Sequence, residues 1–270
     1  MKYFLNIIIF FSLFIVTTNA QGDTSFILER KLKGDISMFA VDRLDNIYIL
    51  SSTDQLKKLD VKGDSIAVFN NVRKTGKVSG IDVSNPLRVL LYYKDFSTVV
   101  MLDRLLNVRN TIDLRKQNIF QVQAISLSYD NKIWLYDEFE NKLKKIDEDG
   151  SLLFETTDFR QLFNESYSFS SIYDQDGLLY LFDKQKGVLV FDYYGTLKNK
   201  ILLYGWNNFK VADKYIFGTK NDSLFRYQPT LFNEQRVLLP QTIRQSSIIN
   251  FTASKVYALK KDELEIYLLK

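Results

Sequence analysis

The 270-residue sequence contains no histidine, no cysteine and only three prolines. Without histidine, the chain lacks the usual general base near neutral pH, the commonest zinc ligand and the base of Ser-His-Asp hydrolases. Without cysteine, it has no thiol nucleophile, no disulfide framework and no N-terminal cysteine to which a lipid could be attached. Pro86, Pro229 and Pro240 lie outside any Ser- or Gly-rich tract, so no interdomain linker is indicated.

The first residues have the composition of a secretory signal. Lys2 precedes an apolar stretch from Tyr3 to Val16, and Thr18-Asn19-Ala20 supplies small residues near a cleavage point. The alternative is a transmembrane anchor, but the apolar run is shorter than the roughly 20 residues that cross a bilayer. We therefore predict a signal peptide over residues 1–20, a single domain over 21–270 and a periplasmic location.

The charges do not indicate a nucleic-acid partner. The 36 basic and 32 acidic side chains give a net charge of +4, and they alternate along most of the chain instead of gathering in one patch. The one compact basic segment is Arg73-Lys74-Thr75-Gly76-Lys77, which we interpret as a solvated turn or, alternatively, as a partner-binding patch.

A short pattern returns six times along the chain: an apolar run, an acidic or small polar turn, and a strand that carries an aromatic residue. The clearest copies are residues 41–50, 127–136 and 173–182. Their spacing is close to the roughly 40–50 residues of a four-stranded propeller blade, so the sequence predicts an all-β, six-bladed β-propeller. A β-sandwich is the alternative fold. The leading strands are expected near Met38, Ile81, Ile125, Ile172, Phe209 and Ile249.

The last repeat ends after its third strand, at Leu264–Leu269, and so lacks a fourth. The strand-like segment Phe26–Leu32 is predicted to fill this place and close the ring, which removes two exposed sheet edges. Helix is expected only as a turn or two at Phe159–Phe163.

The runs Asp45-Asn46-Ile47-Tyr48-Ile49 and Gln55-Leu56-Lys57-Lys58-Leu59-Asp60 resemble the blades of NHL-like six-bladed propellers, and the resemblance extends from Met38 to Lys270. It implies the fold but not one activity, since this scaffold hosts lyases, lactonases, esterases, sensors and binding modules. The NHL-like lyases rely on histidine-bound metals, which this chain cannot supply. Val83-Ser84-Asn85-Pro86 and Phe191-Asp192-Tyr193-Tyr194-Gly195 are similar to a Bacteroidota periplasmic propeller family associated with the plug-type subunit of the type IX secretion translocon. That resemblance implies a soluble disc whose rim loops occlude the periplasmic mouth of a pore.

The absence of histidine and cysteine does not exclude catalysis or metal binding by carboxylates. The densest acidic cluster is Asp137, Glu138 and Glu140 beside Asn141, and it raises the alternative of a calcium-dependent hydrolase or lactonase. Calcium needs about six oxygen ligands that converge from several blades, and the spacing within one hairpin cannot show such convergence. Polar turn residues are therefore the favoured interpretation, and no cofactor is expected. Asp95, Asp183 and Asp222 fall at comparable places in other blades.

Residues repeated from blade to blade are expected to serve the fold, because a binding site breaks the symmetry of repeats. The repeated acids should accept backbone N–H bonds in the turn that follows each of them, and the repeated aromatics should form the core between blades. The acids are Asp60, Asp103, Asp147 and Asp192, and the aromatics are Tyr48, Trp134, Tyr180, Tyr215 and Tyr257.

Departures from the repeat are the better pointers to function. The irregular links between blades carry aromatic and cationic residues, which are enriched in interface hot spots. We predict that they form one mixed surface that binds an envelope protein, although each aromatic could instead fold back onto the end of its sheet. A third hypothesis is a sugar or peptidoglycan-fragment sensor that uses Trp206 and exposed tyrosines. The predicted partner-binding residues are Phe159, Arg160, Phe163, Arg73, Lys74, Arg115, Lys116, Trp206 and Phe209.

Overall fold

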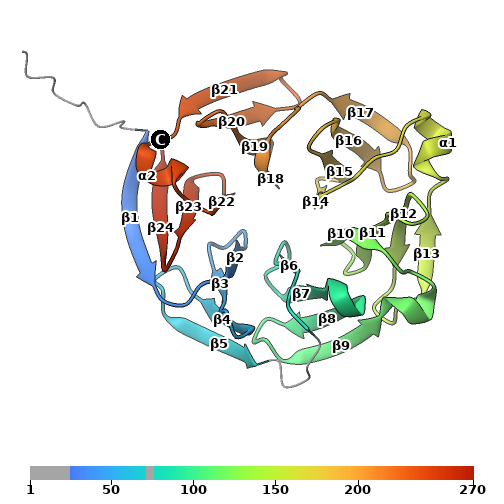
Figure 1. Ribbon diagram of the computed structural model, residues 1–270, viewed down its shortest axis with the longest axis horizontal. Helices are drawn as coiled ribbons and strands as arrows, with labels where there is room; N and C mark the ends of the chain where they lie inside the picture. The colour runs from blue at the N-terminus through green and yellow to red at the C-terminus, as the bar shows by residue number, and fades with distance from the viewer. Residues whose placement is uncertain (1–24, 71–75) are drawn as a thin grey trace, which may run out of the picture.

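The computed structural model describes residues 25–70 and 76–270, and it is a closed ring of six four-stranded antiparallel sheets (Figure 1). The prediction of an all-β, six-bladed propeller is confirmed. The predicted signal peptide over residues 1–20 and the predicted site residues Arg73 and Lys74 lie outside the described residues. None of the helices in the described part of the chain is long and apolar enough to span a bilayer.

Each blade is a meander whose first strand lies nearest the centre and whose fourth lies on the outer rim (Figure 1). Blades 1 to 3 contain β2 (Met38–Val41), β3 (Ile47–Leu50), β4 (Gln55–Leu59), β5 (Ser65–Asn70); β6 (Gly80–Asp82), β7 (Arg88–Tyr93), β8 (Thr98–Asp103), β9 (Val108–Asp113); and β10 (Val122–Leu127), β11 (Ile133–Asp137), β12 (Lys142–Ile146), β13 (Leu152–Glu155). Blades 4 to 6 contain β14 (Ser171–Gln175), β15 (Leu178–Asp183), β16 (Gly187–Asp192), β17 (Leu197–Ile201); β18 (Asn207–Ala212), β19 (Tyr215–Lys220), β20 (Ser223–Gln228), β21 (Asn233–Leu238); and β22 (Ile248–Phe251), β23 (Lys255–Lys260), β24 (Glu263–Leu269), β1 (Phe26–Lys33).

The hydrophobic core is divided among the seams between neighbouring blades. One cluster joins Tyr48 and Leu56 of blade 1 to Leu91 and Leu102 of blade 2, and five similar clusters occupy the other seams. A middle strand has a neighbouring blade on each side, so both of its faces are buried. This explains why the middle strand β7 is a continuous, buried apolar run from Val89 to Tyr93, whereas the rim strand Ser65–Asn70 has no fully buried residue.

The N-terminal strand β1 closes the ring by pairing with β24, as predicted. The Lys31 ammonium lies 2.5 Å from the carboxylate of Glu265. The same carboxylate pairs with the Lys260 ammonium at 2.5 Å and accepts a hydrogen bond from the Tyr267 hydroxyl at 2.6 Å. Burial favours the neutral acid, but these three hydrogen bonds outweigh it and lower the pKa of Glu265 to about 2. An ionic cluster therefore joins the first strand to the last blade.

The repeated acids have the structural role that was predicted. The Asp60 and Asp103 carboxylates each accept two backbone N–H groups of the following turn, at 2.8 and 2.9 Å. Asp192 repeats the arrangement with Tyr194 and Thr196, and Asp147 accepts the N–H of Glu148 at 2.6 Å. Four of the five repeated aromatics are buried, and the half-buried Tyr215 packs against the core cluster between blades 5 and 6, so the repeated aromatics form the core between blades as predicted.

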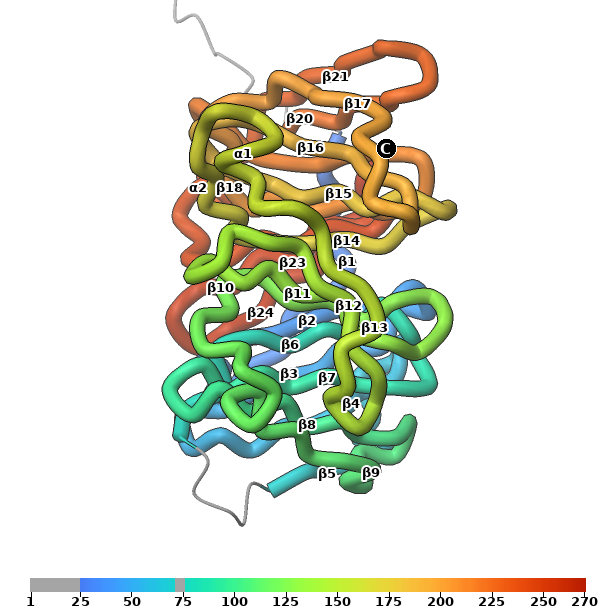
Figure 2. The backbone as a smooth tube through the Cα atoms, turned by 90° about the vertical axis from the view of Figure 1, so that its right-hand side faces the viewer, coloured from blue at the N-terminus to red at the C-terminus, as the bar shows by residue number. Residues whose placement is uncertain are grey.

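The antiparallel meander gives the ring two different faces. The connections from the first to the second strand and from the third to the fourth form the hairpin face. The connections from the second to the third strand and from one blade to the next form the link face, which carries the helices (Figure 2). The helices are η1 (Lys94–Phe96), η2 (Leu114–Gln117), α1 (Phe159–Phe163) and α2 (Gln241–Arg244), of which only α1 was predicted.

Candidate partner-binding face

The predicted site residues that lie within the described part of the chain all belong to the link face or to the seams beneath it. Phe159 is 0 %, Trp206 3 % and Phe209 8 % exposed, so these three rings are not surface contacts. This corrects the expectation of exposed aromatics in the links and agrees with the alternative that the rings fold back onto the sheets. Arg115 and Lys116 are exposed on η2, and Arg160 is exposed on α1.

The rings are buried because each link enters a seam. Phe159 stacks on Phe191 of blade 4 at a centroid distance of 5.4 Å and contacts Tyr136 of blade 3 at 5.8 Å. Phe209 stacks on Phe182 at 4.0 Å. Trp206 lies against Gly218, where a Cβ atom would be 2.3 Å from the indole ring, so only glycine leaves room there.

Helix α1 begins after Asp158, a residue type that caps helix N-termini. The Asp158 carboxylate accepts the N–H of Arg160 at 2.8 Å and so caps the helix. The same carboxylate binds the Arg160 guanidinium, with Nε 3.0 Å from both oxygens, and this hydrogen bonding lowers the pKa of Asp158. Phe163, at the end of the helix, is half-buried against Phe159. The helix therefore presents Arg160 outward and Phe159 inward.

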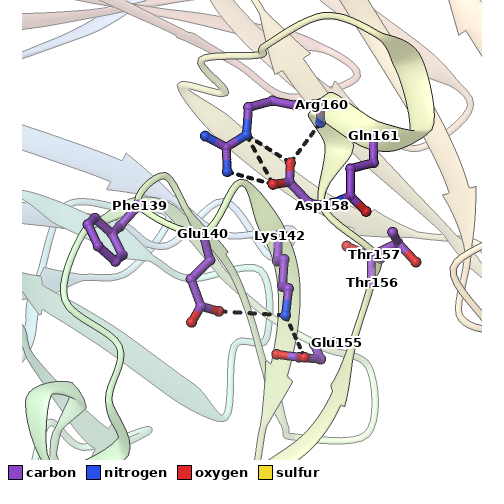
Figure 3. Close-up of a pocket in the computed structure, with 9 residues that line it drawn as sticks. All are labelled: Phe139, Glu140, Lys142, Glu155, Thr156, Thr157, Asp158, Arg160 and Gln161. Carbon is purple, nitrogen blue, oxygen red and sulfur yellow. Dashed lines mark hydrogen bonds and ion pairs between the residues drawn. The ribbon is translucent and has the colours of Figure 1, made fainter.

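An open depression of about 910 Å³ lies between α1 and blade 3 (Figure 3). Across its mouth, Phe139 and Arg160 lie on opposite sides, from the β11–β12 turn and from α1. Lys142 between them binds Glu155 at 2.7 Å and approaches Glu140 at 3.9 Å. The depression is lined by Phe139, Glu140, Lys142, Glu155, Thr156, Thr157, Asp158, Arg160 and Gln161.

Two carboxylates of the acidic cluster at the edge of this depression are paired with a lysine. The buried Lys144 ammonium lies 3.1 Å from Asp137 and 2.5 Å from Glu140. Burial lowers the pKa of Lys144, but its hydrogen bonds to Glu140 and Asp137 outweigh this effect and raise it. Within residues 25–70 and 76–270, no group of three or more acidic side chains is placed to hold a metal ion.

The exposed aromatics of this face are residues that the predicted set omits. Phe96 is 43 %, Phe120 55 % and Phe139 68 % exposed, and we call these three the phenylalanine ridge. Their segments are hydrogen-bonded in series: the Ser97 hydroxyl donates to the Phe120 carbonyl at 3.4 Å, and the Glu138 N–H donates to the Gln121 carbonyl at 2.8 Å. The three segments that carry the ridge are therefore neighbours across blades 2 and 3.

The sequence does hold a signal for two members of the ridge. Phe96 follows Lys94-Asp95, and Phe139 lies between Glu138 and Glu140, so each is a large ring among charged residues in a connection between strands. Such a ring has no alternating apolar neighbours that would place it on a buried strand face. Phe120 lies at the end of the link over residues 114–120, which carries the predicted residues Arg115 and Lys116.

The comparisons with known proteins identify the fold alone. No protein-family model matches this sequence, and no curated protein sequence is significantly similar to it. Solved structures with the same architecture include virginiamycin B lyase from Staphylococcus aureus, at 13% identity and a TM-score of 0.61 over 91% of this chain and 100% of that one. The Cps50 (Swd1) β-propeller domain of Myceliophteria thermophila matches at 9% identity, with a TM-score of 0.61 over 91% of this chain and 100% of that one. PorZ, a surface component of the type-IX secretion system of Porphyromonas gingivalis, matches at 12% identity, with a TM-score of 0.59 over 87% of this chain but 31% of that one. A lyase and a component of a secretion system therefore share this fold, which does not by itself indicate an activity.

Proposed function

We propose that this chain is a non-catalytic, exported β-propeller that binds a protein partner at the cell envelope through its link face. In its most specific form, the proposal is that the disc occludes the periplasmic end of an outer-membrane protein-secretion pore. The phenylalanine ridge carries the proposal, because its three exposed rings lie on neighbouring segments of one face, and gathered exposed apolar side chains mark interaction sites.

The charges around the ridge suit a protein contact. Arg115 and Lys116 precede Phe120 in the same link, and Arg160 lies across the depression from Phe139. Arginine and aromatic residues together are the side chains that most often dominate the binding energy of protein interfaces. Arg160 is already fixed by Asp158, so it loses little freedom when it contacts a partner.

The non-catalytic part of the proposal is supported by chemistry. The chain has no histidine or cysteine, and its densest acidic cluster is paired with Lys144. The location is supported by the composition of residues 1–20, and the connection with secretion by the architecture shared with PorZ and by the sequence resemblance to a Bacteroidota propeller family.

The test is affinity purification from solubilised envelope membranes of the producing bacterium, with the tagged mature chain as bait. We expect the wild type to recover an outer-membrane protein and the triple variant Phe96→Ala, Phe120→Ala, Phe139→Ala to recover at most about a tenth as much, as loss of an interface anchor predicts. The matched control replaces Leu44 and Leu105, exposed apolar residues of the hairpin face, by alanine and should recover the wild-type amount.

Both variants should keep the wild-type melting temperature, because all five side chains are exposed. Recovery of no envelope protein by the wild type, or equal recovery by the ridge and control variants, would contradict the proposal.

A further inference from the structure

Blades 1 and 3 share a lysine that covers an aromatic ring. The Lys58 ammonium lies 5.1 Å from the centroid of Tyr48, and the Lys145 ammonium lies 4.9 Å from that of Trp134. Each lysine precedes a repeated turn acid by two residues, Asp60 in one blade and Asp147 in the other. A feature that occurs in two blades serves the blade itself.

Blade 3 adds something that blade 1 lacks, on the hairpin face at the seam with blade 4. Tyr129, which stands where blade 1 has Arg43, stacks on Tyr193 with centroids 4.8 Å apart and planes within 9°. The Lys145 ammonium lies 5.6 Å from both rings. This departure from the repeat is the kind that marks a site.

Tyr129 is 68 % exposed, yet it is held in place. Its N–H donates to the Asp174 carboxylate at 3.2 Å, and the Ser128 hydroxyl donates to the same oxygen at 2.9 Å. The Tyr193 hydroxyl also donates to Asp174, so the ring beneath Tyr129 is fixed as well. An exposed ring that is already ordered loses little entropy when a ligand covers it.

The charges beside this ring cancel in pairs. Lys145 binds Asp130 at 2.7 Å, and Lys132 binds Asp147 at 2.5 Å. These groups still offer hydrogen-bond donors and acceptors, and with the Asp174 carboxylate beside them they do not favour an anion. Tyr194, next to the stacked Tyr193, is 87 % exposed and adds a hydroxyl.

A ligand that fits this surface has a flat apolar face for the ring and neutral hydrogen-bonding groups around its edge. A pyranose sugar has that form, with C–H groups on its faces and hydroxyls at its periphery. We propose that the Tyr129–Tyr193 stack is a glycan-binding platform, on which a neutral saccharide unit covers Tyr129 while its hydroxyls bond to the paired charges of Asp130, Lys145 and Lys132. This site lies on the face opposite the phenylalanine ridge and does not depend on the protein-binding proposal.

The test is isothermal titration of the purified mature chain with chitohexaose, cellohexaose and maltohexaose, and with hexagalacturonic acid as the acidic comparison. We expect at least one neutral hexasaccharide to bind and the acid to bind more weakly. Tyr129→Ala should weaken binding about tenfold or more, equivalent to loss of one stacked ring, whereas Tyr129→Phe should keep it. Phe120→Ala, on the other face, should bind as the wild type does.

Tyr129→Ala should not unfold the chain, because the ring is mostly exposed, and an unchanged melting temperature verifies this. Binding of none of the three neutral sugars, preference for the acid, or wild-type affinity in Tyr129→Ala would each overturn the proposal. So would loss of a protein partner on Tyr129→Ala in the envelope purification, because a polypeptide would then occupy the platform.

Discussion

The two faces of the ring are built on different principles. On the hairpin face, Asp60, Asp103 and Asp192 close their turns with the same pair of backbone hydrogen bonds. On the link face, the described links differ from one another: one carries η2, another α1 and a third α2. The repeated carboxylates of the hairpin face accept hydrogen bonds from backbone N–H groups, whereas the differing links of the link face determine which side chains are exposed. At the Tyr129–Tyr193 stack, the hairpin face departs from this repeated arrangement.

The largest expected change in stability comes from a ring that is buried beneath the link face. Phe159→Ala should lower the free energy of unfolding by about 3–5 kcal/mol, because a fully buried ring in the seam between blades 3 and 4 leaves a cavity. Leu162→Ala on the same helix should change it by no more than about 0.5 kcal/mol, since Leu162 is 49 % exposed. Urea denaturation measures both. Similar losses in the two variants would mean that α1 does not anchor the seam through Phe159.

A smaller effect is expected on the hairpin face. The buried Asp42 carboxylate accepts the N–H groups of Leu44 and Asn46 at 2.8 and 2.9 Å and the Tyr48 hydroxyl at 3.2 Å. Asp42→Ala should cost about 1–3 kcal/mol, because these donors lose their acceptor.

The exposed Asp64, in the β4–β5 turn of the same blade and on the same face, provides the control, and Asp64→Ala should be close to wild type in the same denaturation experiment. If Asp42→Ala lowered the free energy of unfolding as much as Phe159→Ala does, the proposed difference between the two faces would be contradicted. In that case turn hydrogen bonds would stabilise the fold as much as buried rings.

Most of the fold could be predicted from the sequence because a propeller blade repeats its own pattern. The six leading strands, the closing strand Phe26–Lys33 and the helix Phe159–Phe163 all occur where the periodicity placed them. Each depends on local alternation or on a count of strands, and both can be read from the chain without knowledge of distant contacts.

The exposure of side chains in the links could not be predicted in the same way. Phe159 and Phe139 lie in equally irregular segments, yet one is buried and the other is 68 % exposed. The difference depends on whether the link enters a seam, and the width of a seam is set by two separate blades. The exposure of Arg160 was easier to predict than that of the two phenylalanines, because a guanidinium is rarely buried without a partner.

The central claim is that the link face, and not the hairpin face, contacts an envelope protein. The most direct measurement is photo-crosslinking in living cells, with p-benzoyl-phenylalanine placed at Phe139 in one strain and at Leu105 in another; both positions are exposed, at 68 % and 51 %. The account predicts one crosslinked outer-membrane protein from position 139 and none from position 105. A crosslinked protein from position 105 alone, or from neither position, would contradict it.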